Sequence, residues 1–359
     1  MKKYNLFNPS VFIDESLENL RDLFCTGYLA EGDAVREFES EFSSVFDYEF
    51  CLSVNSGTSA LELAYDLIGI KEGDEVISTV LTAAPTTVPL HRRGATVRFC
   101  DIMENLIISP ESLKQKINNQ TKAVVAVTLG GLPIPYEISS ICLDAGVPLV
   151  IDAAQSTGVS EMYGDYVCHS FQAVKHFTCG DGGMLVLRSE EEYEKAKKLR
   201  WYGVDRSLKS QFKWDSLDNL AKSIDIKESG YKYHMNNISA VLGLVGLKHS
   251  FDMLEKRKRI SSWYEKYINR FDLINGGSHW LQGVIVDNSF DFIKSMKSKG
   301  VGSDMCHIRN DLFSIFGSQR QCLPVMNDYE SKYSYVPMYI DLTELDVKDI
   351  SNRINLHGI

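Results

Sequence analysis

The sequence predicts an α/β protein with a mostly parallel sheet covered by helices. Short apolar runs alternate with stretches of helical spacing through the middle of the chain. From about residue 230 the pattern changes to a long helical stretch and then a mixed remainder. Because 359 residues exceed one average domain, we expect two. We place a large domain at 1–245 and a smaller C-terminal α/β domain at 246–359, with about the first 25 residues packing on the small one.

The elements follow one another in a regular order. Strands are predicted within 51–57, 71–79, 95–102, 122–129, 147–155 and 183–189, helices at 59–70 and 136–146, a polar loop at 205–225 and a long helix at 233–271. In such sheets, ligands bind beyond the carboxyl ends of the strands. We therefore expect the functional residues directly after the strands.

Composition narrows the class of protein. The net charge of -10 and pI of about 5.4 argue against a nucleic-acid surface. The eight cysteines form no CxxC pair and no metal-ligand spacing, which is typical of reduced, mostly buried thiols and predicts no metal site. No run is apolar enough for a signal peptide or a membrane span, so we expect a soluble cytoplasmic protein.

The stretch VNSGTSALELA (54–64) joins a strand to a helix through Ser56, Gly57 and Thr58. Free amides at a helix N-terminus, together with hydroxyls, can bind a phosphate group. The alternative is an ordinary helix cap made by Ser56 or Thr58.

Two further polar residues stand in apolar surroundings. Asp152 closes the strand PLVID, where a carboxylate is costly unless a cation or a hydrogen-bond donor meets it, although it could also be a helix cap or a rim carboxylate. Lys175 lies in SFQAVKHFTCGDGG (170–183), where the alternative is a surface turn. A phosphate seat, an aspartate and a lysine in this order are what pyridoxal 5'-phosphate requires. The lysine forms a Schiff base, and the aspartate keeps the ring nitrogen protonated.

The motifs NSGTSALELA, GDEVI, VIDAAQS, SFQAVKHFTCGDGGML and GYKYHMNNISAVLGL, in this order, resemble the DegT/DnrJ/EryC1/StrS aminotransferases. The resemblance implies a fold-type-I, pyridoxal phosphate-dependent enzyme that aminates nucleotide-linked keto sugars. It implies that Lys175 binds the cofactor aldehyde, that Asp152 pairs with the ring nitrogen and that Gln155 lies near the ring hydroxyl. Gly57, Thr58 and Ser170 would hold the phosphate. The family is built as homodimers with shared active sites, and GYKYHM usually reaches the partner.

Three positions need comment. Ala83 stands where the family often has an aromatic residue stacked on the cofactor ring, so Pro85 or Thr86 could cover the ring, or the packing differs. Lys232 stands where many members carry an asparagine that reaches the partner's phosphate, and it either takes that role as a point charge or faces solvent. One branch of the family has histidine at the lysine position and performs dehydration. Here the count from Ser170 puts Lys175 there, and His176 one place later.

The expected reaction takes the amino group from L-glutamate and gives it to a nucleotide-linked sugar, with a 4-keto-6-deoxyhexose as first choice. The alternatives are a 3-keto sugar, a sugar dehydration, an amino acid lyase activity, or a non-catalytic regulatory subunit that binds the cofactor. Cations and hydrogen-bonding groups must meet the diphosphate. The candidates are His307, Arg309, Asn310 and Arg206, and each could instead be a surface residue.

Overall fold

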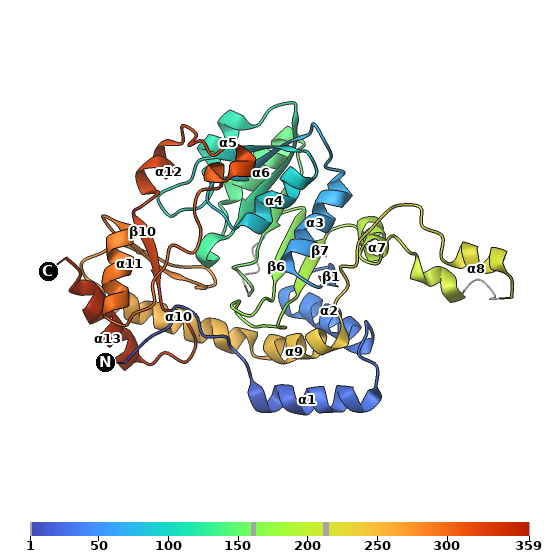
Figure 1. Cartoon of the computed structure of the whole chain (residues 1–359), viewed down its shortest axis with the longest axis horizontal. Helices are drawn as coiled ribbons and strands as arrows, with labels where there is room; N and C mark the ends of the chain where they lie inside the picture. Colours follow the sequence, from blue (N-terminus) through green and yellow to red (C-terminus); the bar gives the residue numbers. More distant parts are fainter. Residues whose placement is uncertain (1, 159–162, 211–214, 359) are drawn as a thin grey trace.

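The computed structural model of the chain describes residues 2–158, 163–210 and 215–358. Its centre is a seven-stranded sheet in the order β1-β7-β6-β5-β4-β2-β3. Figure 1 shows this sheet between layers of helices, with a second group of elements on the side where both chain ends lie. The strands are β1 (Phe50–Val54), β2 (Glu75–Thr79), β3 (Thr96–Cys100), β4 (Thr121–Val127), β5 (Leu149–Asp152), β6 (Tyr166–Ser170) and β7 (Gly183–Leu187).

Pairing in the large sheet is parallel except at one strand. β2 pairs in parallel with β3 and β4, and β4, β5 and β6 continue in parallel, whereas β7 is antiparallel to both β1 and β6. The strands β1, β5 and β6 therefore point the same way, and their carboxyl ends lie along one edge of the sheet. The predicted mostly parallel sheet is confirmed.

Both faces of the sheet are covered, which explains why its strands read as nearly continuous apolar runs. One face packs against α3 and α7, and the other against α2, α6 and α9. The helices are α1 (Ile13–Thr26), α2 (Asp33–Phe46), α3 (Gly57–Ile68), α4 (Ala84–Arg92), α5 (Pro110–Lys116), α6 (Tyr136–Ala145), α7 (Glu190–Leu199), α8 (Leu217–Ser223), α9 (Asn237–Lys248), α10 (Ser250–Tyr267), α11 (Ser289–Ser298), α12 (Pro324–Tyr329) and α13 (Glu344–Asn355). Short 3-10 helices are η1 (Leu129–Gly131), η2 (Arg206–Ser210), η3 (Asn310–Leu312) and η4 (Ser314–Phe316).

The C-terminal part has its own antiparallel sheet in the order β10-β9-β8. Its strands are β8 (Leu273–Ile274), β9 (Gln282–Ile285) and β10 (Tyr333–Val336). A separate apolar cluster joins this sheet to α10, α11 and α13. The N-terminal residues belong to the same cluster, because Tyr4 is buried there and exchanges backbone hydrogen bonds with Gly300 and Gly302.

The structure differs from the sequence prediction in three places. The long helix expected at 233–271 is two helices, α9 and α10, which meet at His249. Of the first 25 residues, the short segment around Tyr4 packs on the small sheet, whereas α1 packs against α9. The polar loop expected at 205–225 contains α8, which Figure 1 shows projecting from the body, and residues 211–214 of that loop lie outside the described residues.

All eight cysteines are free thiols, and five of them are buried. The described helices include none with the length and apolar character that crossing a bilayer requires.

Candidate active site

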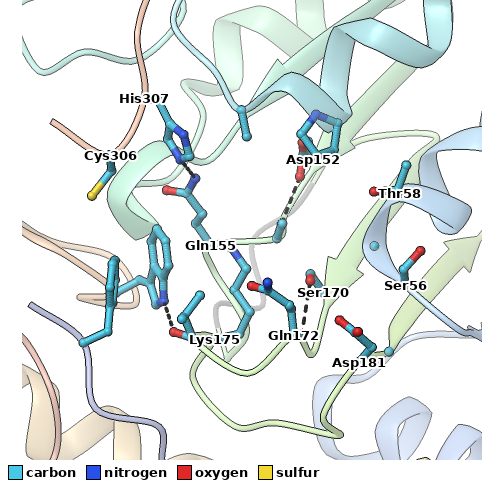
Figure 2. A pocket seen from close by; sticks show the side chains of 18 of the residues that line it. Ser56, Thr58, Asp152, Gln155, Ser170, Gln172, Lys175, Asp181, Cys306 and His307 are labelled. Atoms are coloured by element: carbon cyan, nitrogen blue, oxygen red, sulfur yellow. Dashed lines mark hydrogen bonds between the residues drawn. The ribbon is translucent and has the colours of Figure 1, made fainter. Parts of the chain in front are cut away.

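A cavity of about 550 Å³ opens at the carboxyl ends of β1, β5 and β6. Parts of the chain that are far apart in sequence form its wall: the N-terminal segment, the large sheet and the C-terminal part. Of the predicted site residues, those that line it are Ser56, Gly57, Thr58, Asp152, Gln155, Ser170, Lys175 and His307. Figure 2 shows the two serines and Thr58 on one side of the cavity and His307 on the other.

The first turn of α3 forms one wall. Ser56 is its N-cap, and its hydroxyl accepts a hydrogen bond of 3.1 Å from the backbone N–H of Ser59. Ser56 therefore caps the helix, as the alternative interpretation of this stretch predicted. The cap leaves other backbone N–H groups of the first turn without a partner among the described residues. Within the described chain, the N–H groups of Gly57 and Thr58 have no acceptor, and both residues line the cavity.

Gly57 is needed at the start of this helix because β6 passes close to it. A Cβ atom at this position would lie 2.8 Å from the Cβ of Ser170 and 3.2 Å from its hydroxyl. The close approach brings the hydroxyl of Ser170 beside the free N–H groups of α3. Together they make an anion seat at the positive end of a helix.

Asp152 ends β5 and is only 4% exposed. Its two carboxylate oxygens accept hydrogen bonds from the hydroxyl of Thr86 (2.6 Å) and the backbone N–H of Ala154 (3.1 Å). Burial raises the pKa of Asp152, and these two donors, with the nearby Lys175, oppose that rise. A cation placed against Asp152 would stabilise its charged form further.

Lys175 follows β6 in a tight loop and faces the cavity. Burial lowers the pKa of its amine to about 8, against the opposing effect of Asp152 and then of Cys306. Its nitrogen lies 4.2 Å from the ring centroid of Trp280. At neutral pH most of this amine is still charged, but the neutral form, which attacks a carbonyl group, is far more populated than for an ordinary lysine.

Gln155 is fixed at both ends of its amide. Its oxygen accepts a 2.7 Å hydrogen bond from the backbone N–H of Gly130, and its nitrogen lies 2.9 Å from Nε2 of His307. Burial lowers the pKa of His307 to about 4, so the imidazole is neutral at physiological pH and its Nε2 can accept from the amide. His307 thus links the C-terminal part of the chain to Gln155.

The expectation for Arg309 and Asn310 needs correction, because neither side chain reaches the cavity. Arg309 is 1% exposed, and its guanidinium donates to Asp311, Glu330 and Asn327. Asn310 is also buried and bonds the hydroxyl of Thr87 and the carbonyl of Thr82. Residues 309 and 310 thereby hold the loop after β2 in place. The polar groups of both side chains are hydrogen-bonded within the protein.

Arg206 and Lys232 also lie away from this cavity. The guanidinium of Arg206 is paired with Glu31 at 2.7 Å and stands over the ring of Trp201. Lys232 is exposed, and its backbone carbonyl accepts a hydrogen bond from Asn55 at the end of β1. A role for Lys232 at a phosphate group therefore requires a second chain and stays a prediction.

Several residues that line the cavity were not singled out in the sequence. Gln172 and Asp181 belong to the same loop as Lys175, so their proximity to it in sequence was a usable signal. Phe7 and Trp280 line the cavity from distant segments, and no local pattern marks them. Further lining residues are Leu6, Asp304 and Cys306. At the position of the expected aromatic residue, Ala83 and Pro85 line the cavity, whereas Thr86 is turned toward Asp152.

These residues fit pyridoxal phosphate. The anion seat at Gly57 and Thr58 suits its phosphate group, the hydrogen-bonded carboxylate of Asp152 suits a protonated ring nitrogen, and the amine of Lys175 suits its aldehyde. All three face one cavity, and its volume of about 550 Å³ is in the range of small-molecule sites.

Comparison with known proteins agrees with the cofactor that the site residues indicate. The chain matches the model of the DegT/DnrJ/EryC1/StrS aminotransferase family over residues 12–355. It is 29% identical to the spore coat polysaccharide biosynthesis protein SpsC of Bacillus subtilis, over 95% of this chain and 93% of the relative. It is 26% identical to GDP-perosamine synthase of Vibrio cholerae, over 97% of each. The solved aminotransferase TlmJ from Streptoalloteichus hindustanus is 25% identical and superposes with a TM-score of 0.90, over 99% of this chain and 98% of that one.

A family match that spans nearly the whole sequence fixes the class of protein, and the residues at the cavity agree with the cofactor of that class. The chain belongs to the DegT/DnrJ/EryC1/StrS aminotransferase family, whose enzymes depend on pyridoxal 5'-phosphate.

Proposed function

We propose that this enzyme transfers an amino group from L-glutamate to a nucleotide-linked keto sugar. We take an NDP-4-keto-6-deoxyhexose as the acceptor and an amino sugar for glycan or natural-product biosynthesis as the product. The observation that carries the proposal is the joint presence of Lys175, Asp152 and the anion seat of α3 at one cavity. The relatives support the sugar acceptor, since one is named for a GDP-linked sugar and another for polysaccharide biosynthesis.

Each residue then has a defined task. When bound, pyridoxal phosphate supplies an aldehyde that takes up amines and a ring that withdraws electrons from the attached carbon. The N–H groups of Gly57 and Thr58, with the hydroxyl of Ser170, would hold the phosphate. Asp152 would hold the proton on the ring nitrogen, and Gln155 would orient the ring through its hydroxyl.

Lys175 would move the proton in both halves of the reaction. Its Nζ would take the proton from the α-carbon of glutamate, and later deliver one to the carbon that carried the sugar's keto group. With a pKa of about 8, the amine can both accept and release a proton near neutral pH. General acid–base catalysis of this kind contributes about 10²–10⁴-fold.

Transfer is favoured over dehydration by the orientation of His176. This histidine is buried, and its Nε2 lies 3.1 Å from the backbone carbonyl of Ser278, so it does not face the cavity. The amine of Lys175 occupies the cavity position instead. A purely regulatory subunit would not need this amine or the buried Asp152.

We further propose a cytoplasmic homodimer in which Lys232 serves the partner's site. The exposed position of Lys232, away from its own cavity, supports this. Light scattering should give the mass of two chains. A variant lacking Lys175 mixed with one lacking Lys232 should recover part of the activity by forming hybrid dimers. No recovery, with subunit exchange demonstrated, would contradict shared sites.

The deciding experiment uses ¹⁵N-labelled L-glutamate and a panel of 4-keto and 3-keto sugars linked to GDP, dTDP and UDP. Mass spectrometry should find ¹⁵N in a sugar product with the wild-type chain and none with Lys175→Ala. Loss of a sugar hydroxyl without ¹⁵N uptake would indicate dehydration. If glutamate leaves the absorbance of the bound cofactor unchanged and no sugar is modified, the proposed function is wrong.

A further inference from the structure

The amine of Lys175 rests on an aromatic ring. Its nitrogen stands 4.2 Å from the ring centroid of Trp280. Within the described chain, this nitrogen makes no hydrogen bond and no ion pair. The indole face is therefore its one specific contact among the described residues.

The indole is held rigidly from two sides. Its Nε1 donates a 3.1 Å hydrogen bond to the backbone carbonyl of Val174, the residue before Lys175. Phe7 from the N-terminal segment stacks on it, with ring centroids 5.6 Å apart and planes 27° from parallel. Trp280 is only 3% exposed. The ring thus has a fixed orientation relative to the loop that carries the lysine.

The charged groups around the amine do not replace this contact. Asp152 attracts the ammonium from a distance, but among the described residues the two side chains form neither an ion pair nor a hydrogen bond. The thiol of Cys306 is neutral, because burial raises its pKa to about 12.

Two histidines, His307 at the cavity and His176 behind its wall, lie near enough to the amine to interact with its charge. Burial lowers the pKa of His307 to about 4 and that of His176 well below its ordinary value, so both rings are uncharged at neutral pH. The remaining carboxyl groups of the cavity wall belong to Asp181 and Asp304, and neither is paired with Lys175. The π face of Trp280 is therefore the group in direct contact with the ammonium, and it stabilises the charge at short range.

We propose that the indole face of Trp280 is the resting site of the Lys175 ammonium whenever that nitrogen is not bound to the cofactor. The inference rests on the proposed role of Lys175 and deepens it. The donor amine must take the place of this lysine at the start of the first half-reaction, and the lysine amine must stay within reach until the amino sugar leaves at the end of the second. A resting place on Trp280 keeps it beside the cavity and apart from Asp152, whose charge is needed at the ring nitrogen.

The test measures the pKa of Lys175 in the full-length chain after the cofactor is removed with hydroxylamine. The rate of acylation of Lys175 by a small amine reagent is followed against pH by peptide mass spectrometry. Because a cation–π contact favours the charged amine, Trp280→Leu should lower the pKa of Lys175 by about one. Acylation at neutral pH should therefore become several-fold faster.

Two matched variants interpret that result. Trp280→Phe keeps an aromatic face of weaker attraction and should give an intermediate pKa. Trp263→Phe changes a tryptophan in the apolar cluster of the small sheet and should leave the pKa as in the wild type. An unchanged pKa in folded Trp280→Leu would overturn the proposal, as would an equal shift in Trp263→Phe.

A second readout covers the case in which Trp280→Leu fails to fold. In the wild type, tryptophan emission should change with the same pKa as Lys175 acylation, and this step should vanish in Lys175→Met and in Trp280→Phe. A step that persists in both would refute the contact. Neither measurement uses a sugar or glutamate, so failure of the proposed function and failure of this inference are told apart.

Discussion

The hydroxyl of Thr86 donates a hydrogen bond of 2.6 Å to Asp152, which joins the first turns of α4 to the carboxyl end of β5. A hydroxyl has one proton to give, so the 2.7 Å contact between Thr82 and Thr86 must be donated by Thr82. The two buried threonines thus form a relay that ends on the carboxylate. This relay opposes the cost of burying the charge of Asp152.

Thr86→Val removes the last donor of that relay without changing the side-chain size much. Burial raises the pKa of Asp152 and the Thr86 bond lowers it, so losing the bond raises the pKa further. Asp152 then takes up a proton at higher pH, and the acid side of the pH–activity profile moves upward. Affinity for pyridoxal phosphate should fall by about 10- to 100-fold. The pH–activity profile gives the shift of the acid limb, and absorbance titration gives the affinity for pyridoxal phosphate.

Thr87→Val is the matched control, because Thr87 lies next to Thr86 and is equally buried but bonds Asn310. We expect it to lose some stability while the pH profile stays as in the wild type. An unshifted acid limb in Thr86→Val would mean that the relay does not hold the charge of Asp152.

Lys175→Ala should abolish amino transfer, since it removes the amine that binds the cofactor and moves the proton. The loss from proton transfer alone is about 10²–10⁴-fold. Borohydride reduction and peptide mapping should find the cofactor on Lys175 in the wild type and on no residue in the variant. A small primary amine added to the variant should restore part of the turnover. Normal activity without the lysine would contradict the mechanism.

The strand-end residues were predictable because each follows an apolar run. Asp152 and Lys175 are polar groups in sequence that otherwise predicts an interior, and a parallel sheet brings such ends together. Trp280 was not predictable, since its place over Lys175 depends on how the C-terminal sheet packs more than a hundred residues away. The same holds for Thr86, whose partner is set by the distance between β2 and β5 in the sheet.

Arg309 shows a different limit of prediction from sequence. A guanidinium in a polar stretch suggests a ligand for a diphosphate, and only packing shows whether an internal carboxylate has already taken it. Asp311, two residues later, was a local signal for that alternative. The split between α9 and α10 was equally hidden, because helical spacing continues across His249.

Arg309→Met should therefore reduce stability far more than substrate binding. It leaves the fully buried Asp311 without its ionic partner, and breaking a buried pair costs about 3–5 kcal/mol. Arg320→Met is the control, because Arg320 is 60% exposed and its pair with Glu330 contributes about 0–1 kcal/mol. Urea unfolding measures both. A large rise in KM for the sugar nucleotide at unchanged stability would instead restore Arg309 as a substrate ligand.

His169 predicts how stability depends on pH. It lies in β6 at 1% exposure, beside the rings of Phe42 and Tyr48, and neither of its ring nitrogens has a hydrogen-bond partner among the described residues. Burial lowers its pKa from 6.5 to about 3. As the pH falls below 6.5, the unfolded chain takes up a proton that the folded chain refuses, so the stability present at higher pH is lost.

Between pH 7.5 and pH 5 this single group should cost about 2 kcal/mol of the free energy of unfolding. His169→Phe fills the same space between aromatic rings without a titrating group. Its free energy of unfolding should therefore exceed that of the wild type at pH 5 by more than it does at pH 7.5. His176 and His307, whose pKa values burial also lowers, will keep part of the acid sensitivity in both chains. If both chains lose the same stability between these pH values, the prediction is wrong. His169 would then be hydrated or hydrogen-bonded in solution, and burial would not keep it neutral.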